Sequence, residues 1–128
     1  MKKHYLYLLV LLAALSCKKN DKNQIDENIK PAPGTMHVVI SSNQLFSYDI
    51  TEIDTLTNEF SVTDDQNKSS LDYYFTPVPG HKVIIEAATN TIGSLTGTVT
   101  YKGNVLGPIT TSNTNGRTGF EFSYSVPH

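Results

Sequence analysis

The sequence is poor in cysteine and lacks tryptophan, and its larger part is poor in basic residues. Of 128 residues, one is Cys and none is Trp. A single Cys forms neither an internal disulfide nor a cysteine-based zinc site. From Thr35 to the end, four basic residues stand against nine acidic ones. This balance excludes the basic footprint of a nucleic-acid-binding protein, and the length allows one folded domain.

Motifs for catalysis are also missing. The chain has no nucleophile elbow, no phosphate-binding glycine loop and no zinc-protease motif. Paired carboxylates would need a cleft and sugar-stacking aromatics to hydrolyse a glycoside, and a body this small without Trp offers little room. We therefore expect no enzymatic activity and no cofactor.

A metal site is not expected either. His37 and His81 are too few to bind a metal without carboxylates, and His81 follows the Pro79-Gly80 turn, which predicts a solvated loop histidine. The oxygen-rich segment 64–67 lacks the ligand spacing of a calcium loop, so we expect an ordinary turn there.

The N-terminus has the proportions of an export signal. A short basic segment, 1–4, precedes an apolar run over 5–15. An 11-residue helix spans about 16 Å, against a bilayer core of about 30 Å, so the run is too short for a stable membrane anchor. We predict a signal peptide over 1–16.

Ser16-Cys17 follows that run, and a polar stretch follows Cys17. This arrangement resembles a bacterial lipoprotein signal, which implies a diacylated Cys17 and a lipid anchor in the outer membrane. Residues 17–34 would then be the lipidated Cys and a flexible tether. Lys18-Lys19-Asn20-Asp21 partly matches the surface-export signals of Bacteroidetes lipoproteins. The choice between a periplasmic and a cell-surface position stays open.

Residues 35–128 alternate between apolar and polar side chains, which predicts an all-β domain. Strands are expected over 37–41, 45–53, 59–62, 71–76, 82–88, 95–101, 105–106 and 120–126. Asn43-Gln44 should separate the first two, and Lys102-Gly103-Asn104 should form a hairpin turn. Segments 64–70 and 112–118 are expected to be loops.

Seven or eight short strands at this spacing predict one Ig-like antiparallel β-sandwich. Without a disulfide, its stability must come from the hydrophobic core. The predicted aromatic core residues are Phe46, Tyr48, Phe60, Tyr73, Phe75, Tyr101, Phe120, Phe122 and Tyr124.

The C-terminal half carries a further resemblance, in the strand Lys82-Val83-Ile84-Ile85-Glu86-Ala87-Ala88 and in the segment 93–104 with its turn. It resembles the Ig-like domain of Bacteroidetes lipoproteins that are similar to the soluble part of mycobacterial MmpS proteins. This resemblance implies a small non-enzymatic domain that accompanies an envelope transporter, and it assigns no functional residue.

Three places are candidates for contact or modification. Tyr74 should face away from Tyr73 and Phe75, which makes it an exposed stacking position for a sugar or peptide. Asn113, Asn115 and Arg117 lie in a polar segment near the last strand. The triplet Asp54-Thr55-Leu56 resembles Bacteroidetes O-glycosylation sites, with the glycan on Thr55.

Three functions remain open from the sequence. The leading hypothesis is a lipid-anchored, non-catalytic binding or accessory module of an envelope protein complex. The alternatives are a surface-displayed adhesin or glycan-binding module, and a structural spacer of the envelope. Residues 49–72 hold seven acidic side chains and one Lys, which either dock a basic partner or keep the protein soluble.

Overall fold

The computed structural model describes residues 32–128, and these residues adopt an all-β fold, as the sequence predicts. They form seven strands and no helix: β1 (Met36–Ile53), β2 (Phe60–Phe75), β3 (Lys82–Thr89), β4 (Leu95–Tyr101), β5 (Asn104–Val105), β6 (Ser112–Thr114) and β7 (Arg117–Ser125). The predicted signal peptide, Cys17 and most of the predicted tether lie outside the described residues.

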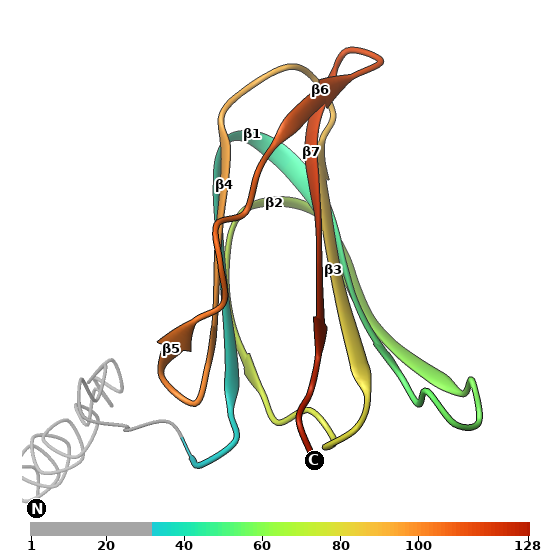
Figure 1. The fold of residues 1–128 in the computed structure, drawn as a ribbon. Helices are drawn as coiled ribbons and strands as arrows, with labels where there is room; N and C mark the ends of the chain where they lie inside the picture. Colours follow the sequence, from blue (N-terminus) through green and yellow to red (C-terminus); the bar gives the residue numbers. More distant parts are fainter. Residues whose placement is uncertain (1–31) are drawn as a thin grey trace, which may run out of the picture. The chain divides into compact units, whose positions relative to one another are not determined.

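β1 and β2 form one long antiparallel hairpin. Met36 pairs with Phe75 at one end of the hairpin, and Ile53 pairs with Phe60 at the other. The pairing is irregular between Ser41 and Tyr48, where β1 bends. Figure 1 shows the two strands crossing from the layer that contains β4 to the layer that contains β3 and β7.

The opposite edge of β1 is divided between two strands. Residues 36–42 pair with β4, and residues 46–53 pair with β3. The loop between β3 and β4 fixes the bend of β1, because the Ser94 N–H donates to the Asn43 side-chain oxygen at 2.8 Å. β7 extends the sheet from β3, and the short strands β5 and β6 lie at its two ends.

The sheet curls so that β4 and β7 face each other across the core. The rings of Tyr101 and Tyr124 lie 5.6 Å apart between these two strands. Gly97 of β4 leaves room for Phe120 of β7, since a Cβ at Gly97 would lie 3.0 Å from the Phe120 ring. The curl gives a sandwich-like packing of two faces, although β1 and β2 run through both.

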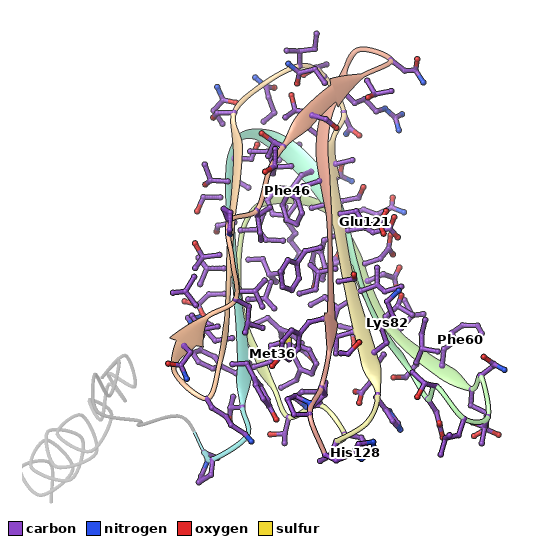
Figure 2. The ribbon with its side chains drawn as sticks, viewed as in Figure 1. Met36, Phe46, Phe60, Lys82, Glu121 and His128 are labelled. Carbon is purple, nitrogen blue, oxygen red and sulfur yellow. The ribbon has the colours of Figure 1, made fainter. Side chains whose placement is uncertain are left out.

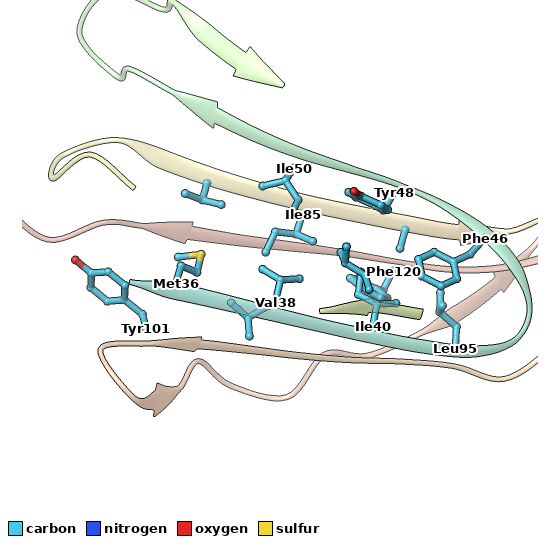
Figure 3. Packing of buried hydrophobic residues seen from close by; sticks show 14 of the residues in the cluster. Met36, Val38, Ile40, Phe46, Tyr48, Ile50, Ile85, Leu95, Tyr101 and Phe120 are labelled. Atoms are coloured by element: carbon cyan, nitrogen blue, oxygen red, sulfur yellow. The ribbon is translucent and has the colours of Figure 1, made fainter. Parts of the chain in front are cut away.

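Alternate residues of the central strands fill the core, as Figure 3 shows. Met36, Val38 and Ile40 of β1 are fully buried, and so are Val83 and Ile85 of β3. A side chain of this kind contributes about 1.5–3 kcal/mol when it leaves water. Because the chain has only one Cys, this burial is the main source of stability.

The predicted aromatic core is right at eight positions and wrong at one. Phe46, Tyr48, Tyr101 and Phe120 are buried, and Tyr73, Phe75, Phe122 and Tyr124 pack against the core. Phe60 is instead 71% exposed. It begins β2 at the far end of the hairpin, and it takes the outer-face position opposite Ile53, so it points away from the core.

The predicted loop 64–70 is wrong, because these residues belong to β2. Their side chains are almost all exposed, so the strand shows no alternation between apolar and polar residues. Between Phe46↔Lys68 and Tyr48↔Asp65, one residue of β1 lies opposite two of β2, which is a β-bulge. Asn67 lies in this bulge with a φ of 58°, a conformation that Asn tolerates well.

Two further boundaries also differ from the sequence expectation. The predicted loop 112–118 contains β6 and the start of β7, joined by a tight turn in which Asn115 and Gly116 have positive φ. Asn43-Gln44 does not divide β1 but lies in its bend. The expected strands over 82–88, 95–101 and 120–126 are confirmed to within one or a few residues.

Candidate functional site

The far end of the β1–β2 hairpin is the most exposed apolar part of residues 32–128. We call residues 51–63 the hairpin end: the last residues of β1, the turn and the first residues of β2. Three of its apolar side chains are exposed: Leu56 at 88%, Phe60 at 71% and Val62 at 47%. Figure 2 shows Phe60 on the part of the hairpin that extends from the body. Exposed apolar side chains that cluster in this way mark interaction surfaces.

The outer face of the sheet continues this apolar surface from strand to strand. Asp49 and Thr51 lie on that face, since Tyr48 and Ile50 beside them are buried. Phe60 pairs with Ile53 of β1, and Val62 pairs with Thr51, whose partner on β3 is Ile84. Aromatic and branched side chains therefore cover these two rows on β1 and β2, whereas Lys82 of β3 lies opposite Ile53 in the first row.

An acidic row lies directly beside these apolar rows. Asp64 of β2 pairs with Asp49 of β1, Asp49 pairs with Glu86 of β3, and Glu86 pairs with Glu121 of β7. We call these four residues the acidic row. All four are exposed, and neighbouring strands lie about 4.8 Å apart. Like charges directly opposite one another destabilise a sheet, so the row opposes folding.

Small side chains adjoin the acidic row on its other side. Ser47, Ala88 and Gly119 line an open hollow of about 290 Å³, together with Asp49 and Glu86 of the acidic row. The outer face thus passes from large apolar side chains, through carboxylates, to a region of small ones.

His81 braces the inner side of the hairpin end, which corrects the expectation of a solvated loop histidine. Its Nδ1 atom lies 3.1 Å from Glu52 Oε1, and the same oxygen accepts the Val78 N–H at 2.6 Å. His81 Nε2 lies 3.9 Å from Asp54 Oδ2. These contacts join the 76–81 loop to the end of β1. The residues that make these contacts also line a pocket of about 280 Å³, and Phe60 lies at its border.

The turn after β1 is closed by its own side chains. Asp54 Oδ1 accepts the Leu56 N–H at 2.8 Å, and this hydrogen bond is the main reason why the pKa of Asp54 lies below its usual 3.8. Thr55, the predicted glycosylation residue, is exposed, and its hydroxyl donates to the Gly80 carbonyl at 3.1 Å. The turn therefore holds the apolar side chain of Leu56 outward.

Tyr74 is exposed, as its place in the strand predicts, but one face of its ring is covered. It pairs with His37 of β1, and the two rings stack at 3.8 Å with an angle of 5°. His37 Nε2 lies 2.8 Å from Asp72 Oδ1. The three side chains form a flat aromatic surface beside a carboxylate on the outer side of β1 and β2.

Asn113, Asn115 and Arg117 lie in the β6–β7 hairpin. All three are exposed, and Asn113 Oδ1 also accepts a hydrogen bond from the Thr118 hydroxyl at 2.7 Å. That hydroxyl also accepts the Gly93 N–H at 3.1 Å. Asn113 thus helps to tie the hairpin to the loop between β3 and β4, which is a structural task.

The structure does not bring Tyr74 together with the β6–β7 hairpin. Tyr74 lies opposite His37, at the start of β1. The β6–β7 hairpin contacts the loop between β3 and β4, and this loop is hydrogen-bonded to Asn43 in the bend of β1. Six residues of strand separate these two positions of β1, or about 20 Å. The predicted contact residues therefore form two separate places.

The described residues offer no metal site: no three His, Cys, Asp or Glu side chains in 32–128 are placed to hold an ion. Over the same residues, no helix has the length and apolar character needed to cross a membrane. A scan against protein-family models, a search of curated proteins and a search of solved structures each find no match to this chain.

Sequence reasoning missed the acidic row and the exposure of Phe60. Asp49, Asp64, Glu86 and Glu121 are far apart in the chain, and only the strand register places them side by side. The one available signal was the excess of acidic residues over 49–72, which includes two members of the row.

Proposed function

We propose that this protein is a lipid-anchored, non-catalytic binding module of the bacterial cell envelope. Acyl chains on Cys17 hold it in the outer membrane, and residues 18–34 link the anchor to the all-β body. The hairpin end is the surface that this body presents to an envelope protein complex. The resemblance to MmpS-like domains favours a complex that contains a transporter.

The observation that supports this proposal is the gathering of exposed apolar side chains at the hairpin end. Leu56, Phe60 and Val62 lie there, and Val78 of the adjoining loop is 49% exposed. Exposed apolar groups cost solubility, and they are explained most simply by a partner that covers them. The two histidines with carboxylate neighbours, His37 and His81, are in structural contacts that hold strands and loops together.

The anchor is tested by fractionating cells that produce the protein or its Cys17→Ser variant. We expect the protein to sediment with outer membranes, because two or more acyl chains hold a protein stably in a bilayer. The substitution should release it, because a serine at this position carries no acyl chain. Protease added to intact cells then distinguishes cell-surface from periplasmic display. A Cys17→Ser protein that stayed with the membranes would remove the lipid anchor from the proposal.

The binding surface is tested with a photo-crosslinking amino acid placed at Leu56 or, as a matched control, at Val105. Both side chains are exposed and apolar, but Val105 lies in β5, away from the hairpin end. We expect a discrete envelope-protein adduct from position 56 in intact cells, and none from position 105. Equal labelling from both positions, or none from either, would contradict a binding role and favour a structural spacer.

The stack of Tyr74 on His37 favours a second candidate, a glycan-binding module. A flat aromatic surface beside the Asp72 carboxylate has the features that hold a sugar ring, with apolar contact on its face and an acceptor for its hydroxyls. A glycan array would test it: saturable binding should be lost in Tyr74→Ala and kept in Tyr124→Phe. Binding that is unchanged in Tyr74→Ala would remove this site.

A further inference from the structure

β2 is a long strand with a single neighbour. It runs over 16 residues, and β1 is its only partner among the described strands. The other two outer strands are short, since β5 has two residues and β6 has three. A long outer strand leaves a row of backbone N–H and C=O groups without partners in the sheet, and these groups can pair with another chain.

One short segment of this edge carries the features that usually prevent such pairing. The segment 65–68 contains Asp65, the bulge at Asn67 and Lys68, which contacts Asp65 at 2.7 Å. Charges and bulges on an outer strand hinder edge-to-edge association. This part of β2 is therefore protected.

The first residues of β2 have none of these features. Phe60-Ser61-Val62-Thr63 contains no charge, no Pro and no Gly. Three of these four residue types favour strands. Phe60 and Val62 are also exposed, so an approaching strand would meet apolar side chains as well as backbone groups. The unprotected segment thus coincides with the apolar part of the hairpin end.

The rows of the outer face indicate which side chains an added strand would carry. Phe60, Val62 and Asp64 begin three successive rows on that face, two apolar and one acidic. Opposite partners across strands interact directly, and a like charge beside Asp64 would extend the repulsion in the acidic row. A basic side chain there would instead neutralise part of it.

We propose that β2 takes up an extended segment of a protein partner along residues 60–64, as an additional antiparallel strand. The segment carries a basic side chain opposite Asp64 and apolar side chains opposite Val62 and Phe60. Its sequence pattern is basic-x-apolar-x-apolar, read from its N-terminus. The proposal rests on the function proposed above, that of a binding module, and names the chemistry of its partner.

We infer that the added strand runs antiparallel to β2, both from the other pairings in this sheet and from the general frequency of antiparallel pairs. All six strand pairings in the described residues are antiparallel. Antiparallel pairs are also the more common kind in proteins, roughly two- to three-fold overall.

A second copy of this chain fits the edge less well. If two β2 strands paired antiparallel about Val62, Glu59 of each copy would lie opposite Asp65 of the other, and Phe60 opposite Asp64. Two pairs of like charges would then oppose the contact. The same positions attract a basic segment, so charge complementarity favours a different partner chain.

The test uses the full chain in a non-ionic detergent and the labelled peptide Thr-Lys-Thr-Val-Thr-Val-Thr. We expect saturable binding in fluorescence anisotropy. Amide hydrogen exchange in the bound protein should slow at every second residue of 60–64, by at least about tenfold, because alternate residues direct their N–H groups to one side of a strand. Unchanged exchange in this segment, or protection at another strand, would overturn the proposal.

A charge exchange tests the register. Asp64→Lys should weaken binding of the Lys peptide about three- to fivefold, which is the size of one cross-strand charge pair. A peptide with Glu in place of Lys should recover the loss in that variant. Glu121→Lys is the matched control, since it makes the same change in the acidic row but on β7, three strands away from the edge. Equal effects of the two substitutions would show that only net charge matters and would refute the register.

The remaining outcomes separate this inference from the proposed function. A concentration-dependent dimer that is abolished by Val62→Lys would assign the edge to a second copy and overturn a basic partner. A Leu56 crosslink in cells without any peptide binding would keep the binding module and refute strand addition. Absence of the crosslink would contradict the proposed function itself.

Discussion

The two halves of the β1–β2 hairpin differ in how much of each strand is buried in the hydrophobic core. In the half near Met36, both strands face the core: Val38 and Ile40 are fully buried in β1, and Leu71 is buried in β2. In the far half, β1 still alternates between buried and exposed residues, but β2 is exposed at every residue from Phe60 to Asn67. One strand is thus part of the core along half its length and lies outside the core along the other half.

The inner side of the far half explains this difference. Ser61, Thr63 and Asp65 occupy the positions of β2 that point the same way as buried Ile50 and Tyr48 of β1. Polar side chains at these positions cannot contribute apolar burial, so backbone pairing with β1 has to hold this part of β2. A strand can thus be kept in a sheet by backbone hydrogen bonds without core burial, which leaves its side chains available for another task.

The largest expected effect comes from removing core volume in the half near Met36. Ile40→Ala should lower the free energy of unfolding by about 2–5 kcal/mol, because it removes buried methyl groups and leaves a cavity. Val62→Ala in the far half should change it by no more than about 0.5 kcal/mol. Chemical denaturation of both variants measures the contrast. A loss at Val62 that matched the loss at Ile40 would place the far half in the core.

The next effect concerns the close approach of the two faces. Gly97→Val should cost about 1–3 kcal/mol of unfolding free energy, since the new side chain would overlap Phe120 and Ile109. Thr98→Val, at an exposed position next to it in β4, is the control and should be nearly neutral. Thermal unfolding of both proteins provides the comparison. A neutral Gly97→Val would mean that β4 and β7 do not pack as closely as described.

A smaller effect, of opposite sign, is expected in the acidic row. Glu86→Lys should raise the free energy of unfolding by about 0.5–1 kcal/mol, because Glu86 lies between Asp49 and Glu121. The gain should shrink as salt is added, since these groups are exposed. Glu59→Lys, outside the row, serves as the control. Destabilisation by Glu86→Lys would show that the row is stabilised by something other than its own residues.

The smallest effect is a pH dependence in the turn of the hairpin end. The hydrogen bond from the Leu56 N–H lowers the pKa of Asp54, so its stabilising contribution is complete above the pKa of the unfolded chain. That contribution is lost as the pH falls through the lower pKa of the folded state. Asp54→Asn, which keeps an acceptor but no charge, should weaken this acid-side loss. Carboxyl NMR titration measures the shift, and an Asp54 pKa at or above 3.8 would contradict it.

The body of the fold is predictable from sequence, because burial on one side of a strand leaves an alternating pattern. The strands around Val83, Val99 and Phe120 carry that pattern and were predicted with nearly correct bounds. The far half of β2 was not, because exposed residues need not alternate and the Asp-rich segment has the composition of a loop.

The candidate site was only partly predictable. The exposure of Tyr74 follows from its place between two core aromatics, but its stack on His37 depends on a partner 37 residues away in the chain, fixed by register. The brace between His81 and Glu52 likewise joins distant segments. Composition places acidic residues near the hairpin, whereas only pairing can align them with Glu86 and Glu121.

The divided edge of β1 also has a consequence for how the chain reaches its fold. Met36 is made early, yet its neighbour on one side is Tyr101, which the ribosome adds much later. The β1–β2 hairpin can form locally. The other edge of β1 stays unpaired until both β3 and β4 have left the ribosome. Long-range pairings of this kind slow folding and prolong the exposure of strand edges. The nascent chain therefore passes through a period in which β1 has to be kept from pairing with other proteins.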